Sequence, residues 1–140
     1  FKLAPGAAAF LDFLKENNIP MTIATMSEWD NVEFYIKEFK LAKWFDVDKI
    51  VYSNGKIPGK PAPDIFLIAA GKIGLNPKDC VVFEDAIAGI NAAKAAGIGK
   101  IIAVDSIEPI EFYRDIDGLS GIITSFDEVD KSMFEIPSVI

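Results

Sequence analysis

Apolar residues along this chain follow two alternating patterns, helical spacing and short continuous runs. The helical pattern is clear near the N-terminus, where Ala8, Phe10, Leu11 and Leu14 would share one face of a helix over residues 5–17. The continuous runs lie between stretches of this kind. Such alternation is typical of a parallel sheet covered by helices, so the chain is predicted to be an α/β protein.

The order of the predicted elements supports one domain over residues 1–140. Strands are predicted over residues 21–26, 49–52, 80–83, 100–104 and 121–124. Further helices are predicted over residues 27–40, 64–72 and 86–96, with a weaker one around 109–114. Ser27 is expected to cap its helix, because a carboxylate follows three residues later, and Gly97 is expected to close the helix before it.

Composition narrows the class of protein. The 140 residues are 51% hydrophobic, which is enough apolar material to bury a sizeable core. The net charge is −7 and no basic cluster follows a helix or loop, so a nucleic-acid partner is not expected. No apolar run reaches the length of a membrane span, and the first residues do not resemble a signal peptide. A cytoplasmic protein without a membrane partner is therefore expected.

Histidine is absent, and there is one cysteine. The lack of histidine excludes serine–histidine and cysteine–histidine nucleophiles, and it excludes most zinc sites. Cys80 lies inside an apolar run and is expected to be a small buried hydrophobic residue. Any chemistry must then depend on oxygen ligands, lysine and hydroxyl groups.

Polar residues follow three of the predicted strands. Thr25 comes at the end of the first strand, Lys60 lies in the loop after the second, and Glu84 and Asp85 follow the third. Since ligands of an open parallel sheet bind at the carboxyl ends of its strands, these side chains are expected to share one edge.

These residue types suit a phosphate and a divalent cation. The Thr25 hydroxyl and the amides of Met26 and Ser27 could hold phosphate oxygens, and Lys60 could neutralise their charge. The carboxylates of Glu84 and Asp85 are hard oxygen ligands of the kind that Mg²⁺ prefers.

Three stretches of the chain resemble motifs of the haloacid dehalogenase superfamily, in its subfamily of small phosphatases and β-phosphoglucomutase-like enzymes. Residues 23–27 are similar to the second, phosphate-binding motif, residues 59–66 to the third, lysine-bearing motif, and residues 82–97 to the fourth, metal-binding motif. The resemblance implies a three-layer, Rossmann-like α/β core with a parallel sheet. It also implies a Mg²⁺ cofactor and a small phosphorylated substrate, with catalytic roles for Thr25 and Lys60.

The first motif of that superfamily has no counterpart. It consists of two aspartates, two residues apart, at the end of the first strand. Asp46 and Asp48 have the spacing but precede a strand, and Asp115 and Asp117 follow what reads as a helix. No nucleophile is therefore expected in this chain. The resemblance implies that the central strand and a helical cap lie outside it, on an N-terminal segment that the folded protein includes.

The implied activity is magnesium-dependent hydrolysis of a phosphate monoester through an aspartyl-phosphate, and the chain alone is expected to be inactive. A β-phosphoglucomutase-type isomerase is an alternative. However, Glu28 and Asp30 lie where that enzyme holds a second phosphate, and their charge favours hydrolysis. A receiver-like domain or a non-catalytic phosphate-binding domain is a further alternative.

Overall fold

The computed structural model describes residues 3–105 and 110–134 of the chain. In this part of the chain, helices and strands alternate as the apolar pattern predicts. In order, they are α1 (Ala7–Glu16), β1 (Ala24–Glu28), α2 (Trp29–Glu38), β2 (Val51–Ser53), α3 (Asp64–Lys72), β3 (Val81–Glu84), α4 (Ile87–Ala95), β4 (Lys100–Val104), α5 (Ile110–Arg114) and β5 (Gly121–Ile123). Short 3₁₀ turns connect several of them.

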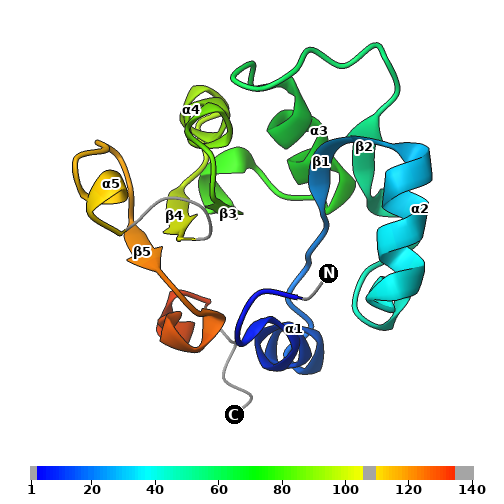
Figure 1. Cartoon of the computed structure of the whole chain (residues 1–140), viewed down its shortest axis with the longest axis horizontal. Helices are drawn as coiled ribbons and strands as arrows, with labels where there is room; N and C mark the ends of the chain where they lie inside the picture. Colours follow the sequence, from blue (N-terminus) through cyan, green and yellow to red (C-terminus); the bar gives the residue numbers. More distant parts are fainter. Residues whose placement is uncertain (1–2, 106–109, 135–140) are drawn as a thin grey trace.

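The strands form two parallel sheets rather than one. β1 pairs with β2, and β3, β4 and β5 form a second sheet in that order. Figure 1 shows the two groups on opposite sides of a ring, with α3 and α4 between them at one side and α1 at the other. The α/β class and the parallel pairing are as predicted.

Helices cover both faces of the larger sheet. Ile101 and Ala103 of β4 belong to a core cluster with residues of α3 and α4, whereas Ile102 packs in a second cluster with Phe10 and Leu14 of α1. A strand that is buried on both faces is typical of a parallel sheet. These two clusters give the three-layer arrangement.

Aromatic packing joins the end of the described chain to its beginning. The ring of Phe10 lies 5.4 Å from that of Phe83 and 5.5 Å from that of Phe126, between ring centroids. The Phe126 amide also donates a hydrogen bond to the Pro5 carbonyl at 2.8 Å. These contacts attach α1 to the β3–β5 sheet.

A cleft separates the two sheets. It has a volume of about 870 Å³ and is lined by residues 21–24 on one side and 80–84 on the other. Phe10 and Leu14 of α1 and Phe66 of α3 line it from the two helical layers. The cleft lies between β1 and β3, where the resemblance places the central strand of the sheet. That a strand fills it stays a prediction.

The largest differences from the predictions are the bounds of β1 and β2 and one helix cap, whereas β3 and β5 differ by one residue, so that Glu84 ends β3 instead of following it. β1 begins at Ala24 and extends to Glu28, because its partner β2 pairs Val51 with Ala24 and Ser53 with Glu28. The predicted cap at Ser27 is therefore wrong: Ser27 lies within β1, and α2 begins at Trp29 after an extended Glu28.

The start of β2 differs for a local reason. The Asp46 side chain accepts a hydrogen bond from the Asp48 amide at 3.1 Å, which caps a 3₁₀ turn over Val47–Lys49. Because residues 47–49 form this turn, β2 begins only at Val51. The bounds of α3 and β4 are as predicted, and Gly97 ends α4 with a positive φ of 76°. Residue 109, where the weaker helix was predicted to begin, lies outside the described residues.

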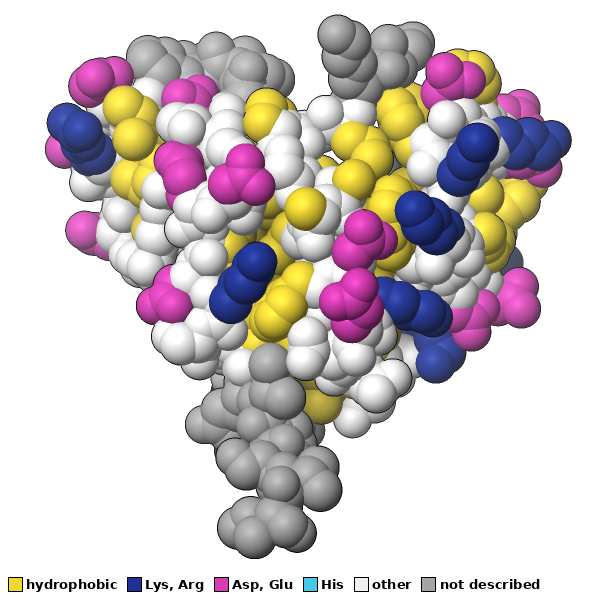
Figure 2. Space-filling model, turned by 90° about the horizontal axis from the view of Figure 1, so that it is seen from below, with side chains coloured by type: hydrophobic (Ala, Val, Ile, Leu, Met, Phe, Trp, Pro, Cys, Tyr) yellow, Lys and Arg dark blue, Asp and Glu magenta, His cyan; other side chains and the backbone are white. Residues whose placement is uncertain are grey.

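Acidic and basic side chains are mixed on one face of the molecule (Figure 2). Figure 2 shows acidic side chains among the basic ones on the face seen from below. None of the helices in the described part of the chain has the length and apolar character needed to cross a bilayer.

Candidate active site

The side chains of Lys60 and Glu84 meet at the carboxyl end of β3. Lys60 Nζ lies 2.7 Å from Glu84 Oε2, and the two side chains are 18% and 11% exposed. Lys60 comes from the loop between β2 and α3, and Glu84 is the last residue of β3. The structure thus brings together two residues that lie 24 positions apart in the sequence, as predicted.

A turn around Lys60 and the start of α3 shape the loop that carries this lysine. The Ala62 amide donates to the Gly59 carbonyl at 3.0 Å, and α3 begins at Asp64. The ammonium group of Lys60 also lies 5.1 Å from the centroid of the buried Phe66 ring, a distance that suits a cation–π contact. Because Phe66 belongs to α3, the helix that follows the loop fixes the position of the charge.

Both oxygens of the Glu84 carboxylate accept hydrogen bonds. Oε2 accepts from Lys60, and Oε1 accepts from the amides of Asp85 at 3.1 Å and Ala86 at 3.4 Å. The carboxylate therefore links the lysine to the turn between β3 and α4. In this arrangement Glu84 orients Lys60 as well as contributing oxygen atoms to the edge of the sheet.

Gly89 makes room for this carboxylate. A Cβ atom added at Gly89 in α4 would overlap Cγ, Cδ and Oε2 of Glu84. Any side chain at residue 89 would thus displace Glu84 from Lys60. The sequence contains Gly89 within the fourth-motif stretch, but nothing in the pattern of residues reveals this contact.

We expect Gly89→Ala to lower the free energy of unfolding by about 1–3 kcal/mol, the usual cost of overpacking a filled site. Gly71→Ala is the matched control: it also adds a methyl group to a helix, yet meets nothing within 4 Å. It should leave stability unchanged or raise it by up to about 1 kcal/mol. Urea unfolding measures both. Equal stability changes in the two variants would contradict the role given to Gly89.

Asp85 is half-buried and follows Glu84 in the same turn. Among residues 3–105 and 110–134, no group of three or more acidic, histidine or cysteine side chains could hold a metal ion. The adjacent carboxylates of Glu84 and Asp85 could supply part of an oxygen donor set. Its chemistry fits Mg²⁺, which takes few protein carboxylates and otherwise keeps water or phosphate oxygens.

Thr25, Met26 and Ser27 lie on β1, across the cleft from β3. The Ser27 amide donates to Thr25 Oγ1 at 3.1 Å, and Thr25 lines a small apolar pocket between β1 and α2 rather than the cleft itself. Met26 lies beside the Lys60 loop, because a Cβ atom added at Gly59 would be 3.8 Å from Met26 Cε. The second-motif residues and Lys60 therefore belong to neighbouring segments, and Met26 is the residue of β1 that lies beside the loop.

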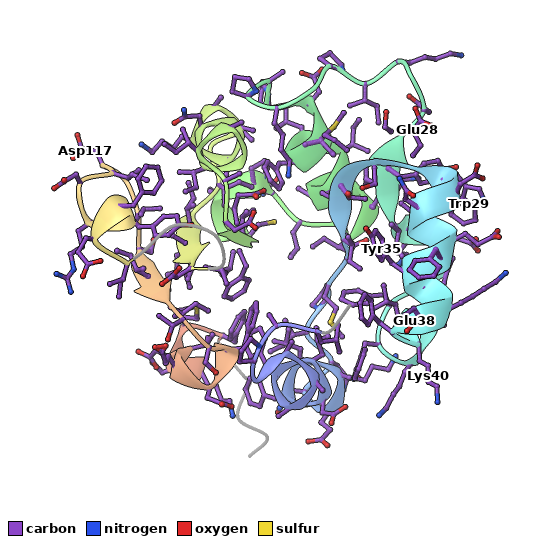
Figure 3. All side chains as sticks on the ribbon, in the orientation of Figure 1. Glu28, Trp29, Tyr35, Glu38, Lys40 and Asp117 are labelled. Carbon is purple, nitrogen blue, oxygen red and sulfur yellow. The ribbon has the colours of Figure 1, made fainter. Side chains whose placement is uncertain are left out.

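The two aspartate pairs that imitate the first motif lie elsewhere. Asp46 caps the turn at the amino end of β2, the end opposite the one near Lys60. Asp115 and Asp117 are exposed after α5, and Figure 3 shows Asp117 at the outer edge of the molecule. Neither pair can supply a nucleophile beside Lys60.

Cys80 does not provide a nucleophile either. Its side chain is buried, and burial, with a smaller effect of the Asp79 charge, raises the pKa of the Cys80 thiol. The thiol is therefore protonated at neutral pH and lacks the reactive thiolate form. This confirms that Cys80 is a small buried residue.

A further contact to the site was not foreseen from the sequence. The hydroxyl of Tyr113, in α5, donates a hydrogen bond to the backbone carbonyl of Asp85 at 2.9 Å. Tyr113 lies 28 residues after Asp85, outside all three motif stretches. No spacing rule links it to the site, so only the tertiary structure reveals it.

Comparison with known proteins identifies several relatives. Residues 1–97 match the family model for haloacid dehalogenase-like hydrolases. A probable pseudouridine-5'-phosphatase of Drosophila melanogaster is 41% identical over 141 residues, covering 98% of this chain and 60% of the relative. A β-phosphoglucomutase of Bacillus subtilis is 41% identical over 96 residues, covering 69% of this chain and 41% of that protein.

A solved structure supports the same relationship. A HAD hydrolase of family IA, variant 3, from Entamoeba histolytica superposes with a TM-score of 0.90 at 41% identity, covering 94% of this chain and 59% of that one. The chain therefore spans about three fifths of the length of these two longer relatives, the Drosophila and Entamoeba proteins.

Proposed function

Because the chain belongs to the haloacid dehalogenase-like hydrolases, we propose that the protein containing it is a magnesium-dependent phosphatase of small phosphate monoesters. The observation that carries this proposal is the ion pair of 2.7 Å between Lys60 and Glu84, next to Asp85 at the carboxyl edge of β3. The ion pair fixes the ammonium group of Lys60 at the carboxyl edge of a parallel sheet. Phosphate ligands of α/β proteins bind at this edge.

Each residue of the edge has a proposed role. Lys60 neutralises the phosphate group and the charge that develops during its transfer. The Thr25 hydroxyl and the amides of Met26 and Ser27 bind phosphate oxygens. Asp85, together with Glu84, holds Mg²⁺, which when bound polarises the phosphoryl group and neutralises its charge.

The nucleophile is proposed to come from a strand that fills the cleft between β1 and β3. Two observations support this. The cleft is lined by backbone segments on both of its sides, 21–24 and 80–84, which a central strand would join into one sheet. About two fifths of the length of these longer relatives also lies outside the matched part. An aspartate at the carboxyl end of such a strand would lie near Lys60 and Asp85.

The experiment compares hydrolysis with isomerisation in the full-length protein, which means this chain together with the segment that is proposed to carry the nucleophile strand. We expect release of inorganic phosphate from pseudouridine 5'-phosphate or a sugar monophosphate in the presence of Mg²⁺. Glu28 and Asp30 are both exposed at the junction of β1 and α2, and their charges disfavour a second phosphate. Conversion of glucose 1-phosphate to glucose 6-phosphate with a bisphosphate activator, without net phosphate release, would instead establish the mutase alternative.

A further inference from the structure

Tyr113 is the largest side chain in the described part of the chain that is fully buried next to the site. Its exposure is 0%, and its ring packs in the core cluster formed with α3 and α4. A buried phenol needs a partner for its hydroxyl group. The Tyr113 hydroxyl donates to the carbonyl oxygen of Asp85 at 2.9 Å.

This hydrogen bond acts on the peptide that joins Asp85 to Ala86, whose amide donates to Glu84 Oε1 at 3.4 Å. The residue after Asp85, Ala86, is the N-cap of α4, has an extended conformation and provides no side-chain cap. The Asp85 amide is held at 3.1 Å by Glu84 Oε1, from the side of β3. The Tyr113 hydroxyl holds the carbonyl of the same residue from the side of α5.

The backbone of Asp85 is therefore clamped at both of its polar groups. The direction of its Cα–Cβ bond follows from the backbone, so the clamp sets where the carboxylate can point. Partners that orient a metal ligand in this way commonly affect affinity for the metal, although they do not touch it.

We propose that Tyr113 is a positioning residue for the magnesium-binding carboxylate of Asp85. The inference rests on the proposed function, because it takes Asp85 as a ligand of Mg²⁺. It goes beyond that function by assigning a role to α5, an element that none of the three motif stretches includes.

Isothermal titration of the full-length protein with Mg²⁺ tests the proposal, with Tyr113→Phe as the variant. The phenylalanine keeps the buried ring and removes only the hydroxyl group. We expect the variant to bind Mg²⁺ about tenfold more weakly, at the lower end of the effect of outer-shell substitutions. At saturating Mg²⁺ the KM for the phosphate ester should stay unchanged, because Lys60 and Thr25 are not affected. Amide hydrogen exchange should be faster at Asp85 and Ala86.

Val129→Ala serves as the control for a general loss of stability. Val129 is buried in the cluster around α1, away from Tyr113, so this variant should lower Tm without changing affinity for Mg²⁺. Mg²⁺ affinity in Tyr113→Phe equal to that of the parent would overturn the proposal, and so would an equal loss in Val129→Ala. A parent protein that binds no Mg²⁺ would instead remove the proposed function, and this inference with it.

Discussion

Asp85→Ala is expected to reduce magnesium-dependent turnover of a phosphate ester at least about 10³-fold in the full-length protein. A metal ion contributes several kcal/mol to stabilising a phosphoryl transition state, and about 1.4 kcal/mol corresponds to a tenfold change in rate. Asp85 is the half-buried carboxylate of the β3–α4 turn, and its neighbour Glu84 already pairs with Lys60. Steady-state kcat/KM, measured over a range of Mg²⁺ concentrations, reports the loss.

Asp117→Ala is the matched control for this variant. Asp117 belongs to the exposed aspartate pair that imitates the first motif, and it lies at the outer edge of the molecule (Figure 3). Its replacement should leave kcat/KM unchanged. Full activity in Asp85→Ala, or a comparable loss in Asp117→Ala, would contradict the assignment of the metal site to the β3 edge.

Lys60→Met is expected to lower kcat/KM about 10²- to 10³-fold, the usual effect of removing one group that stabilises charge in the transition state. The variant keeps most of the aliphatic part of the side chain beside Phe66 and removes the ammonium group. It should also lower the free energy of unfolding by about 1–3 kcal/mol, because the Glu84 carboxylate loses a charged partner at a site that is mostly buried.

Two further variants separate catalysis from stability. Lys56→Met makes the same change of charge at an exposed position in the same loop. It should alter neither kcat/KM nor the free energy of unfolding. Adding Glu84→Gln to Lys60→Met should recover part of the lost stability, since the unpaired carboxylate is neutralised. It should not recover activity. Recovery of activity in this double variant would show that Lys60 acts only by supporting the fold.

The sequence predicted those parts of the fold that local pattern determines. The bounds of α3 and β4 were correct because each is a single apolar segment with clear ends, the prolines before Asp64 and Gly97 before β4. The bounds of β1 were wrong because the extent of a strand depends on its partner. The partner strand β2 lies about 25 residues further along the chain. Because its residue Ser53 pairs with Glu28, β1 extends to Glu28.

The candidate site likewise contains some residues that the sequence could predict and others that it could not. Lys60, Glu84 and Asp85 could be placed together from the sequence, since residues that follow parallel strands meet at one edge of a sheet. Gly89 and Tyr113 could not be assigned roles, because both act through tertiary contacts: one leaves space for the Glu84 carboxylate, and the other donates to the Asp85 carbonyl. Their importance depends on distances that no periodicity encodes.

The central proposal is that the edge formed by Thr25, Lys60, Glu84 and Asp85 serves magnesium-dependent hydrolysis of a phosphate monoester. The most direct test measures release of inorganic phosphate by the full-length protein from a panel of sugar and nucleoside monophosphates, with Mg²⁺ and with EDTA, alongside Lys60→Met. The proposal predicts phosphate release that requires Mg²⁺ and is nearly lost in the variant. Release that persists undiminished in EDTA or in Lys60→Met, or no release from any ester at saturating Mg²⁺, would contradict it.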